Sequence, residues 1–369
     1  MILYNTFYTL LIISTTLLFV YIHNYKNANR FLILLLLYVY HLFFAYVYYF
    51  MSFSNNADSI QYYYHVSNDL EYFNFHFTYG THFIKNITYV FIKYLDFSYL
   101  NMTLLFASFA YFGFYMLFQL LNKVEFGLKK TLIFIFFLPN IHFWTVGIGK
   151  DSFIFFALAL LVYSLQYKKI IFILISLFLV FLVRPHIAFL IVISFGILTL
   201  FYSNIKFYQK VFILLLIALV TVSVMNLLLE YIGLKDIDPT AVGEYIEKRQ
   251  GYNTAGGSSI DIKEYNFFMK LFSFLYRPLF ESGSILSLIV SVENIIYLSM
   301  TLYIVKFRKY IKWTDVSIFS IIFIIIFTFL MSNMIANLGI AVRQKTMIIP
   351  MFFYLFSIVY YAKRMKNVT

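Results

Sequence analysis

Long apolar stretches alternate with short polar ones along most of this chain. They recur from Ile2 to Ala362, and a helix of about 20 apolar residues is long enough to cross a hydrocarbon core roughly 30 Å thick. The fourth to the seventh stretches are shorter than about 17 residues, so they need flanking residues or lie partly outside the lipid. The pattern predicts an all-α fold, a polytopic transmembrane helical bundle of about 11 spans: Ile2 to Ile22, Phe31 to Met51, Leu100 to Leu121, Thr131 to Trp144, Ser152 to Gln166, Ile170 to Val183, Ile187 to Tyr202, Val211 to Glu230, Ser284 to Val305, Val316 to Met334 and Thr346 to Ala362.

Composition supports a single membrane domain. Hydrophobic residues make up 62% of the chain and charged residues only 12%, whereas an ordinary soluble domain has about 25% charged residues. A soluble fold could not bury this much apolar surface. Because no Gly-, Ser- or Pro-rich linker divides the chain, we predict one integral membrane domain over residues 1–369.

The net charge of +12 is distributed unevenly among the predicted loops. If the N-terminus is outside and every span crosses, the cytoplasmic loops hold only two acids, Glu125 and Asp315. The same loops hold sixteen of the 28 basic residues, which are Lys26, Arg30, Lys123, Lys129, Lys130, Lys168, Lys169, Lys206, Lys210, Lys306, Arg308, Lys309, Lys312, Lys363, Arg364 and Lys366. This positive-inside bias predicts an external N-terminus and a cytoplasmic C-terminus, and it explains the basic charge without a nucleic-acid partner.

Two predicted external loops, at about residues 52–99 and 231–283, are too long to be simple connections. In the first, apolar residues at three- and four-residue steps from Phe83 to Tyr94 predict an amphipathic helix in the membrane interface. The second holds the sustained polar stretch RQGYNTAGGSSID from Arg249 to Asp261, with Arg249 as a candidate substrate contact. Loops of this length are more often functional than passive.

No cofactor is predicted from the residue types present. The chain has no Cys, which rules out disulfides, thiolate metal sites and cysteine nucleophiles. The His residues match no zinc spacing. A divalent metal ion bound by other ligands is left open.

The stretch PNIHFWTVGIGKD, from Pro139 to Asp151, interrupts an apolar region with a Pro, two Gly and ionisable residues. Irregular backbone at membrane depth is tolerated only where protein or a water-filled cavity satisfies it. We therefore consider Lys150 and Asp151 candidate substrate-binding residues. The alternative is an ordinary external hairpin, with Lys150 snorkelling and Asp151 capping the next helix.

Further cationic residues lie at the predicted external ends of spans. VRPHIA, RPLFESG and NMIANLGIAVRQK supply the candidate substrate-binding residues Arg184, His186, Arg277, Arg343 and Lys345. Guanidinium groups bind phosphate oxygens in a bidentate way, so Arg184, Arg277 and Arg343 could converge on one anionic ligand. Alternatively, each Arg ends its own helix at the interface.

Asp58 is the candidate catalytic base. It follows the second span closely, and Asp69 and Glu71 lie further along the same predicted external loop. Transfer to a hydroxyl group needs a carboxylate that accepts the hydroxyl proton. The alternative role for Asp58 is a solvated loop residue or a helix cap.

At these positions the sequence resembles Wzy-type O-antigen and capsular polysaccharide polymerases and the related GT-C membrane glycosyltransferases. The matching pieces are ADS at Ala57 to Ser59, FWTVGIGKDS at Phe143 to Ser152, VRPHIA at Val183 to Ala188, YRPLFE at Tyr276 to Glu281 with Glu293 and Asn294, and NLGIAVRQK at Asn337 to Lys345. One departure is that GT-C enzymes usually carry the catalytic acid after their first span, whereas Asp58 follows the second.

The resemblance implies a multi-pass enzyme of the bacterial inner (cytoplasmic) membrane that acts in polysaccharide biosynthesis at the outer face. Its implied partners are a polyprenyl-diphosphate-linked glycan, membrane lipid and other polysaccharide-assembly proteins. Cationic side chains would stabilise the diphosphate as a leaving group, and Asp58 would activate the acceptor hydroxyl.

Two other functions stay open at this point. A lipid-linked oligosaccharide flippase would also need a cationic cavity, but it usually shows internal repeats and charge at mid-membrane depth, and the sequence shows no repeat and almost no mid-span charge. A membrane O-acyltransferase would use His142 or His186 as its base.

Overall fold

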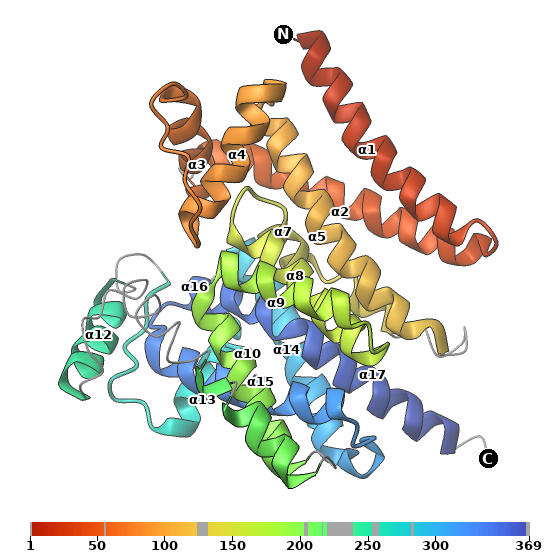
Figure 1. The fold of residues 1–369 in the computed structure, drawn as a ribbon, viewed down its shortest axis with the longest axis vertical. Coiled ribbons are helices and arrows are strands. Elements are labelled where there is room, and N and C mark those ends of the chain that lie inside the picture. Colours follow the sequence, from red (N-terminus) through yellow and green to blue (C-terminus); the bar gives the residue numbers. More distant parts are fainter. Residues whose placement is uncertain are drawn as a thin grey trace. The chain divides into compact units, whose positions relative to one another are not determined.

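The computed structural model describes residues 2–54, 57–123, 132–202, 206–215, 217–219, 239–252, 258–281 and 284–366. These residues form helices and no strand (Figure 1), which confirms the predicted all-α fold. The chain groups into two compact units, Met1–Arg184 and Pro185–Thr369, and each is described by itself. The single domain stays a prediction.

Unit 1 is built from four long helices, four short ones and one 3₁₀ turn among its described residues. They are α1 (Ile2–Asn24), α2 (Ala28–Ser54), α3 (Asp58–Asn68), α4 (Thr81–Leu95), α5 (Tyr99–Gln119), η1 (Leu120–Lys123), α7 (Pro139–Thr145), α8 (Lys150–Gln166) and α9 (Ile170–Val183).

Helices α5 and α8 form the centre of unit 1. Most side chains of both helices are buried, and the two pack closely because Gly113 of α5 lies against the ring of Phe155 on α8. Small residues let membrane helices approach each other in this way. By contrast, α1 and α9 expose large apolar side chains such as Phe7 and Ile170, as expected of surfaces that face lipid.

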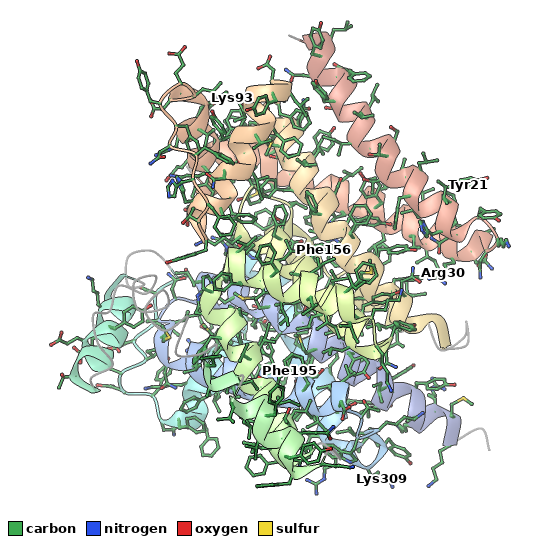
Figure 2. The ribbon with its side chains drawn as sticks, viewed as in Figure 1. Tyr21, Arg30, Lys93, Phe156, Phe195 and Lys309 are labelled. Carbon is green, nitrogen blue, oxygen red and sulfur yellow. The ribbon has the colours of Figure 1, made fainter. Side chains whose placement is uncertain are left out.

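The helices of unit 1 run between two chemically different ends. We call one of them the basic end; it contains the α1–α2 turn, the end of α5 and the α8–α9 turn. Two hydrogen bonds to Gln119 bring these segments together: Arg30 donates to its side chain, and Tyr167 donates to its carbonyl at 3.1 Å. Helix α2 has 27 residues and so carries the chain about 40 Å away from this end. Figure 2 shows Arg30 near the α1–α2 turn and Lys93 on α4, far from it.

The opposite end of unit 1, the acidic end, contains Asp58 and the beginnings of α3, α4, α5 and α8. Tyr99 of α5 donates to Ser52 of α2 at 2.8 Å, and Asn101 of α5 donates to Asn5 of α1 at 3.2 Å. All the described acidic residues of unit 1 belong to this end, because each lies next to a helix terminus found there. They are Asp58 after α2, Asp69 and Glu71 after α3, Asp96 before α5 and Asp151 at the beginning of α8. This separation agrees with the predicted charge bias. The orientation of the termini stays a prediction.

Unit 2 contains longer helices joined by short bent elements. They are α10 (Pro185–Phe201), an apolar helix at Phe207–Leu219, α12 (Pro239–Tyr252), α13 (Phe267–Tyr276), α14 (Ile285–Lys306), η2 (Arg308–Tyr310), α15 (Asp315–Met334), α16 (Leu338–Gln344), η3 (Lys345–Met347) and α17 (Ile349–Lys366).

Basic residues of unit 2 also gather at helix ends. Lys363 of α17 lies 3.7 Å from the ring centre of Phe307, at the end of α14.

Aromatic stacking joins α10 to α15. Phe195 of α10 stacks on Phe319 near the beginning of α15, with ring centres 4.5 Å apart. Figure 2 labels Phe195 within α10 and Lys309 at the α14–α15 connection.

The described residues contain fewer candidate spans than the eleven predicted for the whole chain. Five described helices are long and apolar enough to cross a membrane: α1, α2, α5, α14 and α15. The count rises to seven if each of two bent pairs, α7 with α8 and α16 with α17, forms one span. The predicted spans at Ile170 to Val183 and Ile187 to Tyr202 are helices of 14 and 17 residues. The predicted span Val211 to Glu230 lies partly outside the described residues.

Both long loops contain helices. The first holds α3 and α4, so the helix predicted around Phe83 to Tyr94 is present. Its Ile84 and Ile92 are buried, whereas Val90 and Tyr94 on the predicted apolar face are exposed. The second loop contains α12 and α13. The external position of both loops stays a prediction.

Candidate functional site

A sharp bend between α7 and α8 positions the first pair of ionisable residues. The two helices meet at 116°, and Asp151 lies in the first turn of α8, where the helix dipole favours a negative charge. Arg184 follows the last residue of α9 and donates from Nη2 to Asp151 Oδ1 at 2.7 Å. Both residues are buried, at 3% and 8% exposure. The structure therefore brings Asp151 and Arg184 together as a buried ion pair.

Ser59, the neighbour of Asp58 in sequence, contacts this bend through Tyr48. Tyr48 of α2 donates to Ser59 Oγ at 3.1 Å, and Ser59 also bonds Tyr99 at 2.8 Å. The ring of Tyr48 packs on Gly147 in the α7–α8 bend. Asp58 itself is exposed and begins α3. The predicted motifs at Ala57 to Ser59 and Phe143 to Ser152 thus lie beside each other.

Gly80 links the same end to the last turn of α9. Its backbone N–H donates to the Leu182 carbonyl at 2.7 Å, two residues before Arg184. The φ angle of Gly80 is 73°, a conformation that side chains with a Cβ atom rarely adopt. The glycine therefore allows α4 to begin against the residues that hold Arg184. We call Tyr48, Ser59, Gly80, Asp151 and Arg184 the Asp151 cluster.

Replacing Gly147 by Ala is expected to disrupt this packing. A Cβ atom at Gly147 would overlap the Tyr48 ring and lie 2.7 Å from Tyr48 Oη, so the Tyr48–Ser59 hydrogen bond must shift. Overpacking of this kind costs about 1–3 kcal/mol, which thermal unfolding in detergent would detect.

Gly149 offers a matched control in the same bend. No heavy atom lies within 4 Å of the Cβ position at Gly149, and its φ of 169° is extended. Gly149→Ala is therefore expected to be tolerated. Equal losses in the two variants would contradict the packing of Tyr48 on Gly147.

The second group of ionisable residues lies inside unit 2, around Lys345. Lys345 is 5% exposed, and its ammonium donates to the Leu275 carbonyl at 2.9 Å and to Asn294 Oδ1 at 2.5 Å. Asn294 in turn donates to the Pro278 carbonyl at 2.9 Å. Glu293, also buried, precedes Asn294 on α14. Leu275, Pro278, Glu293, Asn294 and Lys345 form what we call the Lys345 cluster.

The Lys345 cluster joins three stretches that the sequence had singled out separately. They are Tyr276 to Glu281, the pair Glu293 and Asn294, and Asn337 to Lys345. Asn294 is the tenth residue of α14, about 15 Å along the helix axis. Lys345 therefore contacts α14 well inside that helix and not at its end.

Arg277 is held by unit 2 itself. Its Nε and Nη2 donate to the two carboxylate oxygens of Glu281 at 2.5 and 2.7 Å, and its Nη1 donates to Tyr265 at 2.7 Å. The bonds from Arg277 lower the pKa of Glu281, and the bonds to Glu281 raise the pKa of Arg277. An anionic ligand on Arg277 would therefore compete with Glu281.

The Arg277–Glu281 pair predicts an acid-dependent part of the stability. Because the folded-state pKa of Glu281 lies below its ordinary value of 4.5, the pair stabilises unit 2 above that pH and is lost as the pH falls through the folded pKa. Thermal unfolding between about pH 5 and pH 3 should show a steeper loss of stability in the parent chain than in Glu281→Gln. Identical pH profiles would mean that the pair contributes nothing.

The remaining predicted residues are placed as follows. His186 is half-buried in the first turn of α10, and Arg343 is half-buried on α16, two residues before Lys345. Lys150 is half-buried as the first residue of α8. Arg249 falls within α12, but its side chain lies outside the described residues. Arg184 belongs to unit 1 and Arg277 and Arg343 to unit 2, so their convergence on one ligand stays a prediction.

The sequence interpretation missed several polar contacts. His142, predicted on the external side, is fully buried and bonded to His41 of α2. His41 could have been noticed, because an ionisable residue inside an apolar span is a functional hypothesis by default. Tyr48 and Tyr99 had no distinguishing signal among the 34 tyrosines of the chain.

A shallow groove also lies between α1 and α2. Its lining includes Leu18, Tyr21, Phe31 and Leu35, near the basic end. Tyr21 is labelled in Figure 2, close to the α1–α2 turn. The groove is mostly apolar and far along α2 from Asp58, so it supplies no catalytic group.

The described residues contain no group of three or more His, Asp or Glu side chains that could hold a metal ion. Comparisons with protein-family models, with curated proteins and with solved structures found no match to this chain.

Proposed function

We propose that this chain is a membrane glycosyltransferase of the polysaccharide-polymerase type, which joins polyprenyl-diphosphate-linked sugars or oligosaccharide repeat units. One observation carries the proposal. At the acidic end of unit 1, an exposed carboxylate, Asp58, lies beside a helix bend that holds a buried guanidinium, Arg184. A base and a cation on one side of a bundle are what transfer from a diphosphate carrier requires.

In this mechanism Asp58 accepts the proton of the acceptor sugar hydroxyl. The hydroxyl oxygen then forms a bond to the anomeric carbon of the donor, and the bond from that carbon to the diphosphate oxygen breaks. The electron pair leaves with the diphosphate, whose developing charge is stabilised by cationic side chains. Asp58 suits the role of base because it is exposed at the end of a helix, within reach of a soluble glycan.

Arg184 and Lys150 are the proposed phosphate contacts in unit 1. Arg184 bonds Asp151 through Nη2, and guanidinium has five N–H groups, so it can hold Asp151 and a phosphate oxygen together. Lys150 precedes Asp151 at the N-terminus of α8, where backbone N–H groups and the helix dipole also favour an anion. The predicted substrate contacts Arg277, Arg343 and Lys345 belong to unit 2, where a phosphate on Arg277 would replace Glu281.

The lipid part of the proposed donor needs an apolar surface. Helices α1, α2 and α9 expose large apolar side chains over much of their length, as a chain in the bacterial cytoplasmic membrane would. Membrane lipid and other polysaccharide-assembly proteins are the remaining proposed partners.

A flippase for the same lipid-linked glycan is a second candidate, and the Lys345 cluster favours it. Glu293 is buried near the middle of α14, and the buried Lys345 of η3 bonds the neighbouring Asn294. Charge at such depth is typical of transporters. The sequence alone had indicated almost no charge within the predicted spans.

Deletion of the gene followed by analysis of surface polysaccharide separates these functions. Loss of a polymerase is expected to leave single repeat units, both on the lipid carrier and at the outer face. A truncated repeat unit would indicate a single-sugar transferase. Complete repeat units confined to the cytoplasmic face would indicate a flippase. An unchanged glycan would refute all three, and loss of O-acetyl groups alone would indicate an O-acyltransferase.

A further inference from the structure

Two histidines face each other inside unit 1 and have no role in the proposed transfer. His41 lies in the middle of α2 and His142 lies on α7, and both are completely buried. Their Nδ1 atoms are 2.8 Å apart. This is a hydrogen-bond distance, so one hydrogen must lie between two nitrogens.

The outer nitrogens of the two rings are both directed at backbone carbonyls. His41 Nε2 lies 3.0 Å from the Ala107 oxygen, and His142 Nε2 lies 2.6 Å from the Phe136 oxygen. A carbonyl oxygen only accepts hydrogen bonds, so each Nε2 must carry a hydrogen. A neutral imidazole has only one N–H, so in two neutral rings the hydrogen is on Nε2 and both Nδ1 atoms have none.

Two neutral rings would therefore present two lone pairs to each other at 2.8 Å. One additional proton removes this repulsion and turns the contact into a hydrogen bond. We propose that His41 and His142 form a proton-binding site, in which the two rings share one proton between their Nδ1 atoms and together carry a single positive charge.

The faces of the aromatic residues around the pair offset part of the cost of burying a positive charge there. Phe114 of α5 stacks on the His142 ring, with centroids 4.3 Å apart and planes at 6°, and Phe44 stacks from α2 at 6.0 Å. The face of an aromatic ring attracts a cation. Behind Phe114 lies Phe155 of α8, with ring centroids 4.7 Å apart, which keeps this side of the pair apolar.

The titratable side chains that pack against the pair are Tyr40 of α2 and Tyr111 of α5. Their hydroxyls donate to the carbonyls of Phe137 and Leu34, at 2.9 and 2.8 Å. Both are therefore neutral phenols.

The bound proton joins α2 to α7 directly, because it lies between His41 and His142. The Nε2–H of the same His41 ring joins α2 to α5 through the Ala107 carbonyl. Helix α7 forms the first arm of the bend, and Lys150 and Asp151 begin the second arm, α8. Proton binding at this pair thus fixes the helix that precedes the Asp151 cluster in the bend.

Nitrogen-15 NMR of the full chain in lipid nanodiscs, with labelled histidine, tests the proposal. Three N–H groups are expected on the pair near neutral pH, including one strongly deshielded hydrogen coupled to two Nδ1 nitrogens. Two N–H groups on the pair, with an unprotonated nitrogen facing either the partner ring or a carbonyl, would overturn it.

Variants assign the signal. His41→Asn is expected to remove the shared hydrogen, whereas His65→Asn, at an exposed position on α3, is expected to leave it unchanged. If His41→Asn does not fold, the number of N–H groups in the parent chain still decides the question. The measurement does not depend on transferase activity.

Discussion

Asp58→Asn is expected to abolish glycosyl transfer while leaving the protein folded and inserted in the membrane. Asn has the shape of Asp but cannot accept the hydroxyl proton, and loss of a general base typically lowers the rate by about 10²–10⁴-fold. The exposed position at the beginning of α3 means that folding should not depend on the carboxylate. Turnover of a lipid-linked donor by the purified variant measures the effect.

Asp69→Asn is the matched control for this experiment. Asp69 is also exposed and follows the last residue of the same helix, so the change removes the same charge from α3 without removing the proposed base. It is expected to retain transfer. Equal activity of Asp58→Asn and the parent chain would remove Asp58 from the mechanism.

Asp151→Ala is expected to cause the largest loss of stability in unit 1. Arg184 would remain buried at 8% exposure without its carboxylate, and breaking a buried pair in this way costs about 3–5 kcal/mol. Arg184→Met should cost less, because the N-terminus of α8 still stabilises the Asp151 charge. Unfolding in detergent micelles by heat or denaturant measures both.

The double variant Asp151→Ala with Arg184→Met completes the thermodynamic cycle. Replacing both charges by apolar groups avoids an uncompensated charge, so the double variant should be more stable than Asp151→Ala. A surface change such as Asp69→Asn should stay within about 0.5 kcal/mol of the parent. A loss in the double variant that equals the sum of the losses in the two single variants would show that Asp151 and Arg184 do not interact.

The helical fold was predictable because apolar periodicity is strong in this sequence, but the spans were not. Hydropathy does not distinguish two short spans from one bent pair, and the bends at Gly147 to Gly149 and at Ile348 depend on tertiary packing. Pro139 begins α7 instead of lying within a span from Thr131 to Trp144. Among the described residues, two bends between helices therefore make the number of candidate spans depend on how each bent pair is counted.

The candidate site was predictable only in part. Asp151 with Arg184, and Lys345 with Asn294, come from stretches that the sequence had marked by Pro, Gly and charge within apolar surroundings. Their pairing depends on contacts between residues 33 and 51 positions apart, which spacing alone cannot give. Arg277 and Glu281 are only four residues apart, so the sequence alone could have predicted this ion pair.

The most direct test of the central claim is an assay of the purified chain in nanodiscs with a polyprenyl-diphosphate-linked oligosaccharide. The proposed function predicts products longer than the starting oligosaccharide, release of polyprenyl diphosphate in equal amount, and loss of both in Asp58→Asn. Movement of the lipid-linked donor across a vesicle membrane, without elongation and without release of diphosphate, would contradict it.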